Sequence, residues 1–464
     1  MEIRVPGTPP TRLPATTIRR ERLDPNALRV VERLRRFGCE AYLVGGCVRD
    51  LLLGLTPKDF DVATSARPRQ VRRFFRNCRI IGRRFKLAHV VFGDRVVETA
   101  TFRRKPEGIE EGTDLLITDD NLFGTAEEDA VRRDFTINGL FYDPEAGEVI
   151  DHVGGLADLE LRTLRTIGDP WVRLREDPIR ILRAVKFAAR LDFQIDPIMW
   201  EAMVGLAGEI RRSAPPRVLE ETYRLMRGGK AREAIRLLWE CGALAVVFPS
   251  LAERLGEPLP GDPGTSEPSH LLWRHLEGLD AHVRDGGVAT NSLILSTLFL
   301  ERFGLETGLD RNAPEGATSK DPGQVVDRML TPLMERLRVS RNDAGFARRI
   351  LVAQRRFVQR GRRRVRPQSF VRQDYFPEAL ALLGIRGHAG DVPEEVYAAW
   401  VSRREDGPSP PSGEGPRGEG ERHWSPSASR GPRRRRRRGR RRGPRIGSSP
   451  TSPDGGPRPD SDPG

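Results

Sequence analysis

The sequence has 464 residues, enough to bury two or more hydrophobic cores, so we expect more than one domain. Its formal charge of +14 favours a polyanionic partner, most simply nucleic acid. Four cysteines without CxxC spacing argue against a zinc site or disulfide framework and predict a reducing cytoplasm, and no run of ~18 apolar residues predicts a membrane span.

The first informative stretch is a buried strand, Ala41–Val44, which runs into Gly45 and Gly46 and then a predicted helix over 47–53. Glycines let the backbone approach a ligand closely, and the free N–H groups of a helix start attract phosphate. Arg49, in the first turn, is placed to reach the same anion. A glycine pair alone is more often a tight corner.

Two carboxylates follow in the order Asp59-Phe60-Asp61. Residues i and i+2 of a strand share one face, so Asp59 and Asp61 should point together and Phe60 into the core. Two adjacent carboxylates repel unless a cation lies between them, and hard oxygen ligands with room for phosphates suit Mg²⁺. The alternative is a solvated turn.

Two further strands are expected over 79–92 and 95–103, joined by Gly93-Asp94. Glu98 lies on the polar side of the second strand. It is either a third carboxylate for the metal site or an ordinary exposed strand glutamate, and the sequence does not favour one over the other.

Thr125 and Glu128 form a capping box that should begin a helix, with Arg132, Arg133 and Asp134 near its end. These three charged residues form either a helix salt-bridge cluster or a functional group. In the functional interpretation an arginine binds a triphosphate and the aspartate lies near the metal.

A basic amphipathic helix is predicted over Arg175–Leu191. Asp177, Arg180 and Arg183 are spaced by three, which places them on one helix face. A carboxylate can accept from an exocyclic amine and an arginine can donate to a base, so this face could read a nucleobase. A solvated basic face is the common alternative.

The remaining chain is predicted to be helical up to about residue 400, apart from loops over 257–268 and 310–324. His270, His275 and His282 lack the spacing of a metal motif and are interpreted as structural. Aromatics beside arginines over Phe370–Leu383 could stack bases of a single strand, although helix packing explains them equally. From Gly407 onward fourteen arginines face six acidic residues in a Pro/Gly/Ser-rich segment, predicted to be a disordered tail that contacts phosphates.

The motifs GGCVRD, LLG, PKDFDVAT, RRDFTIN and EDPIR…RAVKFAAR, in this order, resemble the class II nucleotidyltransferase family shared by bacterial poly(A) polymerases and CCA-adding enzymes. The resemblance implies an α+β fold: a small mixed-sheet, polymerase-beta-like head followed by an all-helical body. We therefore expect a flexible N-terminus (1–25), a nucleotidyltransferase head (26–168), a helical nucleotide-selecting neck (169–255), a helical RNA-binding body (256–400) and the disordered tail (407–464).

The same resemblance implies template-independent transfer from ATP to an RNA 3′ end, with two Mg²⁺ held by Asp59 and Asp61. Asp134 is implied as a third acidic residue, with Glu98 its rival on geometric grounds. Gly45, Gly46 and Arg49, with Arg132 or Arg133, would hold the triphosphate. Asp177 and Arg180 would select the base, alongside Arg183.

The run Gly82–Val90 (GRRFKLAHV) is similar to the poly(A) polymerase branch, so poly(A) addition is expected over CCA addition. An RNA-binding protein with an inactive head is the further alternative, which the retained carboxylates oppose. We expect a monomer whose basic tail could also contact RNA-decay proteins.

Overall fold

The computed structural model describes residues 9–82, 86–104, 122–256, 270–309, 320–358 and 367–405. Residues 105–121, 257–269, 310–319 and 359–366 lie outside these ranges, and so do the predicted tail 407–464 and Arg83, Arg84 and Phe85 of the run Gly82–Val90. Within the described residues no helix is both long and apolar enough to cross a membrane.

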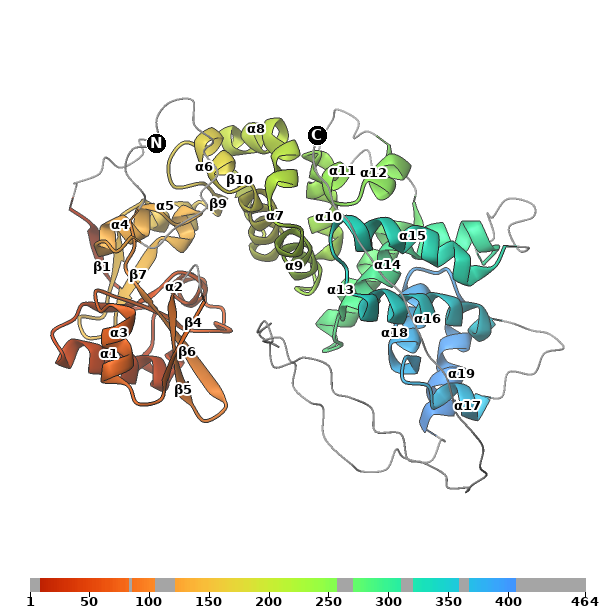
Figure 1. The fold of residues 1–464 in the computed structure, drawn as a ribbon, viewed down its shortest axis with the longest axis horizontal. Coiled ribbons are helices and arrows are strands. Elements are labelled where there is room, and N and C mark those ends of the chain that lie inside the picture. The colour runs from red at the N-terminus through yellow and green to blue at the C-terminus, as the bar shows by residue number, and fades with distance from the viewer. Residues whose placement is uncertain are drawn as a thin grey trace, which may run out of the picture. The chain divides into compact units, whose positions relative to one another are not determined.

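An eight-stranded mixed sheet forms the first part of the chain (Figure 1). Its order is β1-β8-β7-β2-β3-β6-β5-β4; only the β3–β6 pair is parallel. The strands are β1 (Thr11–Pro14), β2 (Ala41–Val44), β3 (Asp61–Thr64), β4 (Cys78–Ile81), β5 (Leu87–Phe92), β6 (Arg95–Thr101), β7 (Leu140–Asp143) and β8 (Glu148–Asp151). Short helices join them: η1 (Arg20–Arg22), α1 (Pro25–Arg36), α2 (Gly46–Leu52), α3 (Pro68–Phe74), α4 (Ala126–Val131) and η2 (Thr136–Asn138).

The sheet has two differently covered faces. Alternation in β2 and β3 places Leu43 and Val62 on one face, where they join the core that α1 also enters. Val44 and Ala63 lie on the other face, in a smaller cluster with Phe141. Asp61 pairs with Val44 across the antiparallel ladder, so it lies on this second face, away from α1.

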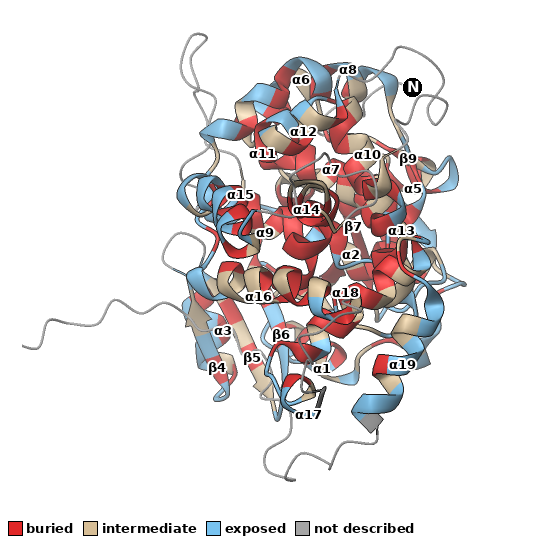
Figure 2. Ribbon diagram, turned by 90° about the vertical axis from the view of Figure 1, so that its right-hand side faces the viewer, coloured by how far each residue is buried: buried red, intermediate tan, exposed pale blue. Residues whose placement is uncertain are grey.

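Helices make up nearly all of the rest of the described chain, apart from a small parallel pair, β9 (Thr163–Leu164) and β10 (Gln194–Ile195). Figure 2 shows their buried sides, and α14 is buried along most of its length among α13, α15, α16 and α18. The helices are α5 (Gly155–Glu160), α6 (Pro170–Glu176), α7 (Ile179–Leu191), α8 (Pro197–Leu206), η3 (Ala207–Arg212), α9 (Pro215–Met226), α10 (Ala231–Glu240), α11 (Ala243–Val247), α12 (Pro249–Leu255), α13 (Leu271–Arg284), α14 (Asn291–Thr307), α15 (Pro322–Arg336), α16 (Arg341–Val358), α17 (Pro367–Val371), α18 (Phe376–His388) and α19 (Glu394–Glu405).

The expected fold class, a mixed-sheet head followed by a helical body, is confirmed. Three local expectations differ from the structure. The N-terminal stretch is not wholly irregular, because Thr11–Pro14 pairs with β8 at the sheet edge. The single strand expected over 79–92 is two strands, β4 and β5, separated after Ile81.

The third difference concerns the predicted helix over Arg175–Leu191, which is broken into α6 and α7. Pro178 lacks an N–H group and disfavours helical geometry in the residue before it. Asp177 accordingly has an extended backbone, with φ −150° and ψ 92°. It therefore does not share a helix face with Arg180 and Arg183.

Candidate active site

A glycine turn links β2 to α2. Gly45 has φ +72° and ψ −125°, a conformation that side-chain-bearing residues rarely adopt. A Cβ at Gly45 would lie 2.8 Å from Nη1 of Arg133. The turn therefore requires glycine for two reasons, its backbone angles and the close approach of an arginine.

Two carboxylates meet beside this turn through the register of the parallel strands. Val62 of β3 is aligned with Thr99 of β6, so Asp61 and Glu98 are neighbours on the same face of the sheet. Glu98 is also 3.6 Å from His89 on β5 (Oε1 to Nε2). The parallel register thus brings together two acidic residues that are 37 positions apart.

The pKa of the Asp61 carboxyl is raised in this environment. Burial, with smaller contributions from Glu98 and Asp59, raises it from 3.8 to about 6, and Arg133 opposes this rise. The sequence predicted that Asp59 and Asp61 share a strand face, but β3 begins at Asp61, so Asp59 precedes the strand and is exposed. Across the ranges that the structure describes, no three His, Cys, Asp or Glu side chains are gathered closely enough to form a complete metal cluster.

Arg132 and Arg133 are held by one buried carboxylate, Asp129. Arg133 donates to Asp129 Oδ2 from Nε (3.2 Å) and Nη2 (3.0 Å), and Arg132 donates to Oδ1 at 3.0 Å. Both side chains remain about one fifth exposed. Burial opposes ionisation of Asp129, but the two arginines lower its pKa overall. The pair is therefore fixed and charged, yet still accessible.

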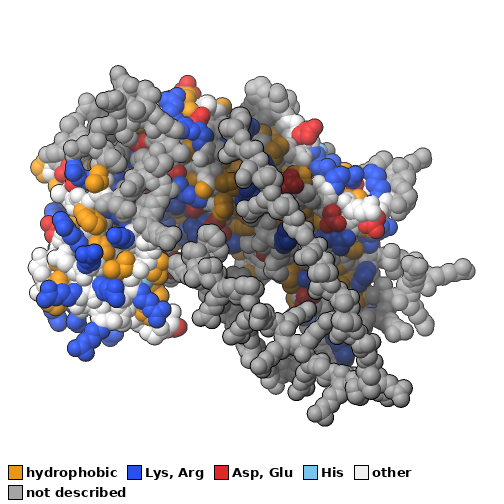
Figure 3. Space-filling view, in the orientation of Figure 1, with side chains coloured by type: hydrophobic (Ala, Val, Ile, Leu, Met, Phe, Trp, Pro, Cys, Tyr) orange, Lys and Arg blue, Asp and Glu red, His pale blue; other side chains and the backbone are white. Residues whose placement is uncertain are grey.

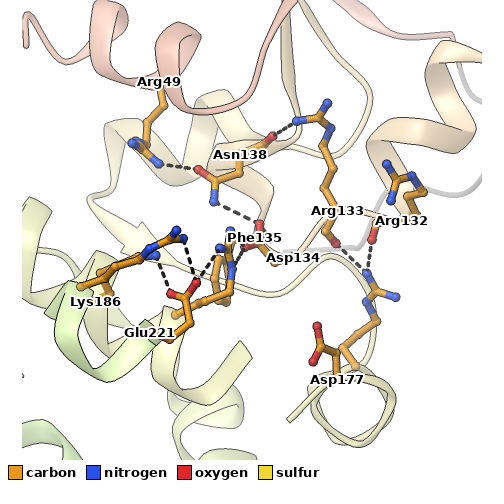
Figure 4. Close-up of polar contacts among 12 residues, drawn as sticks. Arg49, Arg132, Arg133, Asp134, Phe135, Asn138, Asp177, Lys186 and Glu221 are labelled. Atoms are coloured by element: carbon orange, nitrogen blue, oxygen red, sulfur yellow. Dashed lines mark hydrogen bonds and ion pairs between the residues drawn. The ribbon is translucent and has the colours of Figure 1, made fainter. Parts of the chain in front are cut away.

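Arg49 is only 2% exposed and is engaged inside the protein (Figure 4). It donates to Asp50 Oδ1 (2.6 Å) and to Asn138 Oδ1 (2.5 Å), and it lies over the ring of Phe187. Asp50 also accepts from Arg190 at 2.9 Å. The structure thus places Arg49 in an internal network that braces α2, whereas the sequence predicted direct contact with an anion.

Asp134 is likewise fully engaged. It accepts from Arg183 Nε (2.7 Å), Asn138 Nδ2 (3.0 Å) and the Phe135 N–H (2.9 Å) (Figure 4). Burial alone would raise its pKa, but the charge of Arg183 and the hydrogen bonds from Asn138 and Arg183 hold the pKa far below its usual range. The strand register thus brings Glu98 beside Asp61, whereas Asp134 is bound to Arg183 and Asn138.

The predicted base-selecting residues have separate partners. Asp177 is bound by both terminal nitrogens of Arg217, at 2.9 and 2.6 Å. Arg180 is buried and donates to the Arg173 carbonyl (2.6 Å) and to Glu176 (3.2 Å). Arg217 thus fixes the Asp177 carboxylate from α9, and Arg180 is fixed from α6.

A buried carboxylate on α9 extends this network. Glu221 accepts from Lys186 Nζ at 2.9 Å and lies 3.9 Å from Arg183 Nη1. Figure 4 shows Glu221 and Lys186 together beside Asp134. Arg183 therefore lies near two carboxylates, Asp134 and Glu221, and Lys186 pairs with Glu221.

Sequence reasoning missed the residues that hold these groups. Arg173 donates to the carbonyls of Arg132 (2.8 Å) and Arg133 (2.6 Å), joining α6 to the end of α4. Asn138 links Arg49 to Asp134. A signal was present for two others, because Arg217 and Glu221 are four apart and so share one face of α9.

The aromatic residues near the C-terminal end of the described chain form a core. Phe357, Phe370, Phe376 and Trp400 are buried and contact one another at ring-centre distances of 5.1 to 6.3 Å. Helix packing is thus the correct interpretation of this cluster, and base stacking on these rings is not supported.

Three family models match the chain. They describe a poly A polymerase head domain over residues 41–165, a probable RNA and SrmB-binding site of polymerase A over 192–255, and a polymerase A arginine-rich C-terminus over 321–442. The first match contains the glycine turn, Asp61, Glu98 and Asp134.

Similar proteins come from both branches. Poly(A) polymerase I of Salmonella typhi is 43% identical over 289 residues, which cover 61% of this chain and 61% of the relative. The CCA-adding enzyme of Streptococcus suis is 36% identical over 231 residues, covering 50% of this chain and 56% of the relative. The matched part of the chain thus spans less than two thirds of either curated relative.

Among solved structures, the CCA-adding enzyme of Bacillus stearothermophilus in complex with CTP has a TM-score of 0.58 and 26% identity, and the match covers 82% of each chain. The fold, the ordered motifs and the three matched family models all indicate the same family. The chain belongs to the nucleotidyltransferase family that bacterial poly(A) polymerases share with CCA-adding enzymes.

Proposed function

We propose that this protein adds AMP from ATP to the 3′ hydroxyl of RNA without a template. The observation that carries the proposal is the meeting of Asp61 and Glu98 beside the glycine turn, with Arg133 against that turn. Nucleotidyl transfer needs carboxylates that bind a metal ion close to a positively charged side chain that binds the triphosphate.

The acidic residues fit Mg²⁺ by their chemistry. Asp61 and Glu98, with Asp59, supply hard oxygen donors, and their mutual repulsion raises the pKa of Asp61. Mg²⁺ commonly takes one or two protein carboxylates and completes its shell with water and substrate phosphates, so a full protein cage is not required. When bound, two such ions would acidify the 3′ hydroxyl and neutralise charge on the leaving pyrophosphate.

The reaction forms a bond between the 3′ oxygen and the α-phosphorus and breaks the bond to the β-phosphate, releasing pyrophosphate. The protein contributes mainly position and charge. Arg133, with Arg132, would bind the triphosphate from its fixed place on Asp129. Gly45 and Gly46 would allow the phosphates to approach the backbone.

Asp177 and Arg180 would select the base, with an oxygen of Asp177 accepting from the exocyclic amine of adenine and Arg180 donating to the ring. Arg217 would hold the Asp177 carboxylate in place. Arg49 and Asp134 have positioning roles in this proposal, and Glu98 has the third carboxylate role.

Poly(A) addition is favoured over CCA addition by two observations. All three matching family models describe poly(A) polymerases, and identity to the poly(A) polymerase relative exceeds that to the CCA-adding one, 43% against 36%.

We extend the proposal to RNA processing or decay in a reducing compartment such as the cytoplasm, in keeping with four free cysteines.

The test is primer extension with purified protein, Mg²⁺, a labelled RNA and each nucleotide separately. A long ladder with ATP alone is expected. Use of CTP followed by a single A would instead identify CCA addition, and no extension would support an RNA-binding protein. Asp61→Ala should abolish extension while RNA binding persists; a variant that extends RNA at the wild-type rate would refute the assignment.

A further inference from the structure

An arginine-rich surface lies on the sheet face opposite the carboxylates. Helix α1 packs on the face formed by Leu43 and Val62, whereas Asp61 and Glu98 belong to the other face. Helix α3 contacts α1 on this reverse side. Any ligand bound here is therefore separated from the candidate active site by the sheet.

The surface is built from exposed arginines of α1, α3 and the turn after α3. From Arg67 to Gly82 the sequence contains six arginines and no acidic residue. Among the described residues no carboxylate forms an ion pair with four of the exposed arginines, Arg36, Arg72, Arg73 and Arg76. Figure 3 shows Lys and Arg side chains gathered over α1 and α3 around apolar side chains. We call this the reverse-face arginine surface.

An exposed aromatic residue lies within this surface. Phe37 is 51% exposed and stacks on Phe74, with ring centres 4.1 Å apart and planes 3° from parallel. The Arg33 guanidinium lies 5.9 Å from the Phe37 ring centre and donates from Nε to the Phe74 carbonyl at 2.7 Å. Flat aromatic rings among arginines are the arrangement on which bases of a single strand stack while phosphates bind the charges.

Two adjoining hollows, of about 450 and 460 Å³, lie along α1, the first on this surface and the second between α1 and the turn after β7. Both are lined by Glu32 and Arg36, which shows that they adjoin along α1. The first also contains Arg76 and Phe75. Each hollow is within the range of ~300–1,000 Å³ that accommodates small ligands such as a nucleotide.

We propose that the reverse-face arginine surface binds single-stranded RNA, with phosphates on Arg36 and Arg76 and a base on Phe37. It is a second RNA site, distinct from the one that holds the 3′ end. RNA as the partner rests on the proposed function. An anionic lipid surface would be attracted by the same charges, but the stacked aromatic pair and the hollows match separate bases better than a flat membrane.

The test measures equilibrium binding of a labelled 30-nucleotide RNA to the full chain, without ATP, over a series of salt concentrations. Each phosphate contact with a single strand contributes roughly −0.7 to the slope of log K against log salt. Arg36→Ala with Arg76→Ala should therefore make the slope less steep by about 1.4. The matched variant, Arg36→Lys with Arg76→Lys, retains both charges and should retain the slope.

Two single variants separate stacking from charge. Phe37→Ala should weaken RNA binding about fivefold or more while leaving the salt slope unchanged. Glu32→Gln removes a negative charge between the two hollows, so RNA should bind more tightly. A gain of affinity is not expected from a change that merely disturbs folding.

The proposal is overturned if the double alanine variant binds RNA with wild-type affinity and slope. It is also overturned if that variant loses binding only to phosphatidylserine vesicles. Adenylation of a trinucleotide primer, too short to occupy both sites, should be unchanged in all these variants. If the wild-type protein adds no AMP but the slope still changes, the proposed function fails and the reverse-face site stands.

Discussion

Asp134 and Arg183 form a partly buried ion pair that joins the segment after α4 to α7, with 2.7 Å between Oδ2 and Nε. Asp134→Ala would leave Arg183 without its main counter-charge. We expect a loss of about 3 kcal/mol in the free energy of unfolding, at the lower end for buried pairs because Arg183 keeps 29% of its side chain exposed. Urea denaturation measures this loss. Replacing both partners, Asp134→Leu with Arg183→Met, should recover part of it; no recovery would argue against the ion pair as the cause.

Glu98 is expected to contribute to cation binding, and Asp134 is not. Glu98→Gln should weaken Mn²⁺ binding, measured by water-proton relaxation, and lower kcat by roughly 10²-fold or more with little change in stability. Glu98 is about half exposed, so its removal leaves no buried cavity. Asp134→Asn should leave Mn²⁺ affinity within about twofold of wild type.

The matched control for Glu98 is Glu160→Gln, an exposed carboxylate at the end of α5, which should change neither Mn²⁺ affinity nor kcat. The assignment of the third carboxylate would be reversed if Asp134→Asn abolished Mn²⁺ binding while Glu98→Gln did not.

The features that could be predicted from sequence are local ones. The Gly45-Gly46 turn and the Asp59–Asp61 spacing depend on residues within a few positions of each other, and their placement after β2 and at the start of β3 follows from hydrophobic pattern alone. The ordered motifs then identified the family. Fold class followed from that resemblance.

What could not be predicted depends on pairing across the fold. Glu98 meets Asp61 only because β6 is parallel to β3 in one particular register, and a shift by one residue would turn it to the other face. Arg49 binds Asn138, which is 89 positions away. The break at Asp177 is different, because Pro178 indicates a helix break at this position in the sequence itself. The prediction of one continuous helix relied instead on the helical spacing of the flanking residues.

The two glycines of the turn should respond differently to substitution. Gly45→Ala would force a side chain into a backbone conformation with φ +72° and against Arg133, so we expect roughly 1–3 kcal/mol of destabilisation and a raised KM for ATP. At Gly46 a Cβ would meet only Arg49 Nη2, at an ordinary 3.7 Å. Gly46→Ala is therefore the control for stability, and thermal melts with ATP titrations measure both. Equal loss of stability in the two variants would contradict the steric argument.

Cation binding should depend on pH through Asp61. Burial and the neighbouring Glu98 raise its pKa to about 6, so below that pH the carboxyl is neutral and a proton competes with the cation. Mn²⁺ affinity should rise with pH up to about 6, by roughly tenfold per unit, and then level off. Glu98→Gln removes a charge that raises this pKa, so the plateau should begin at lower pH. An unchanged profile in that variant would show that another group controls the titration.

The bidentate contact of Arg217 with Asp177 should determine how strictly ATP is selected. Arg217→Ala frees the carboxylate to rotate, so the ratio of kcat/KM for ATP over CTP should fall about tenfold, in keeping with loss of one oriented hydrogen bond to the base. Arg217→Lys keeps the charge but cannot bind both oxygens, and its ratio should be intermediate. Arg211→Ala, an exposed arginine in η3 just before α9, should leave the ratio unchanged even if RNA affinity falls. If Arg217→Ala lowers both kcat/KM values equally, Arg217 affects binding without controlling selection. A fall confined to ATP would identify Arg217 as the residue that holds Asp177 in its selecting position.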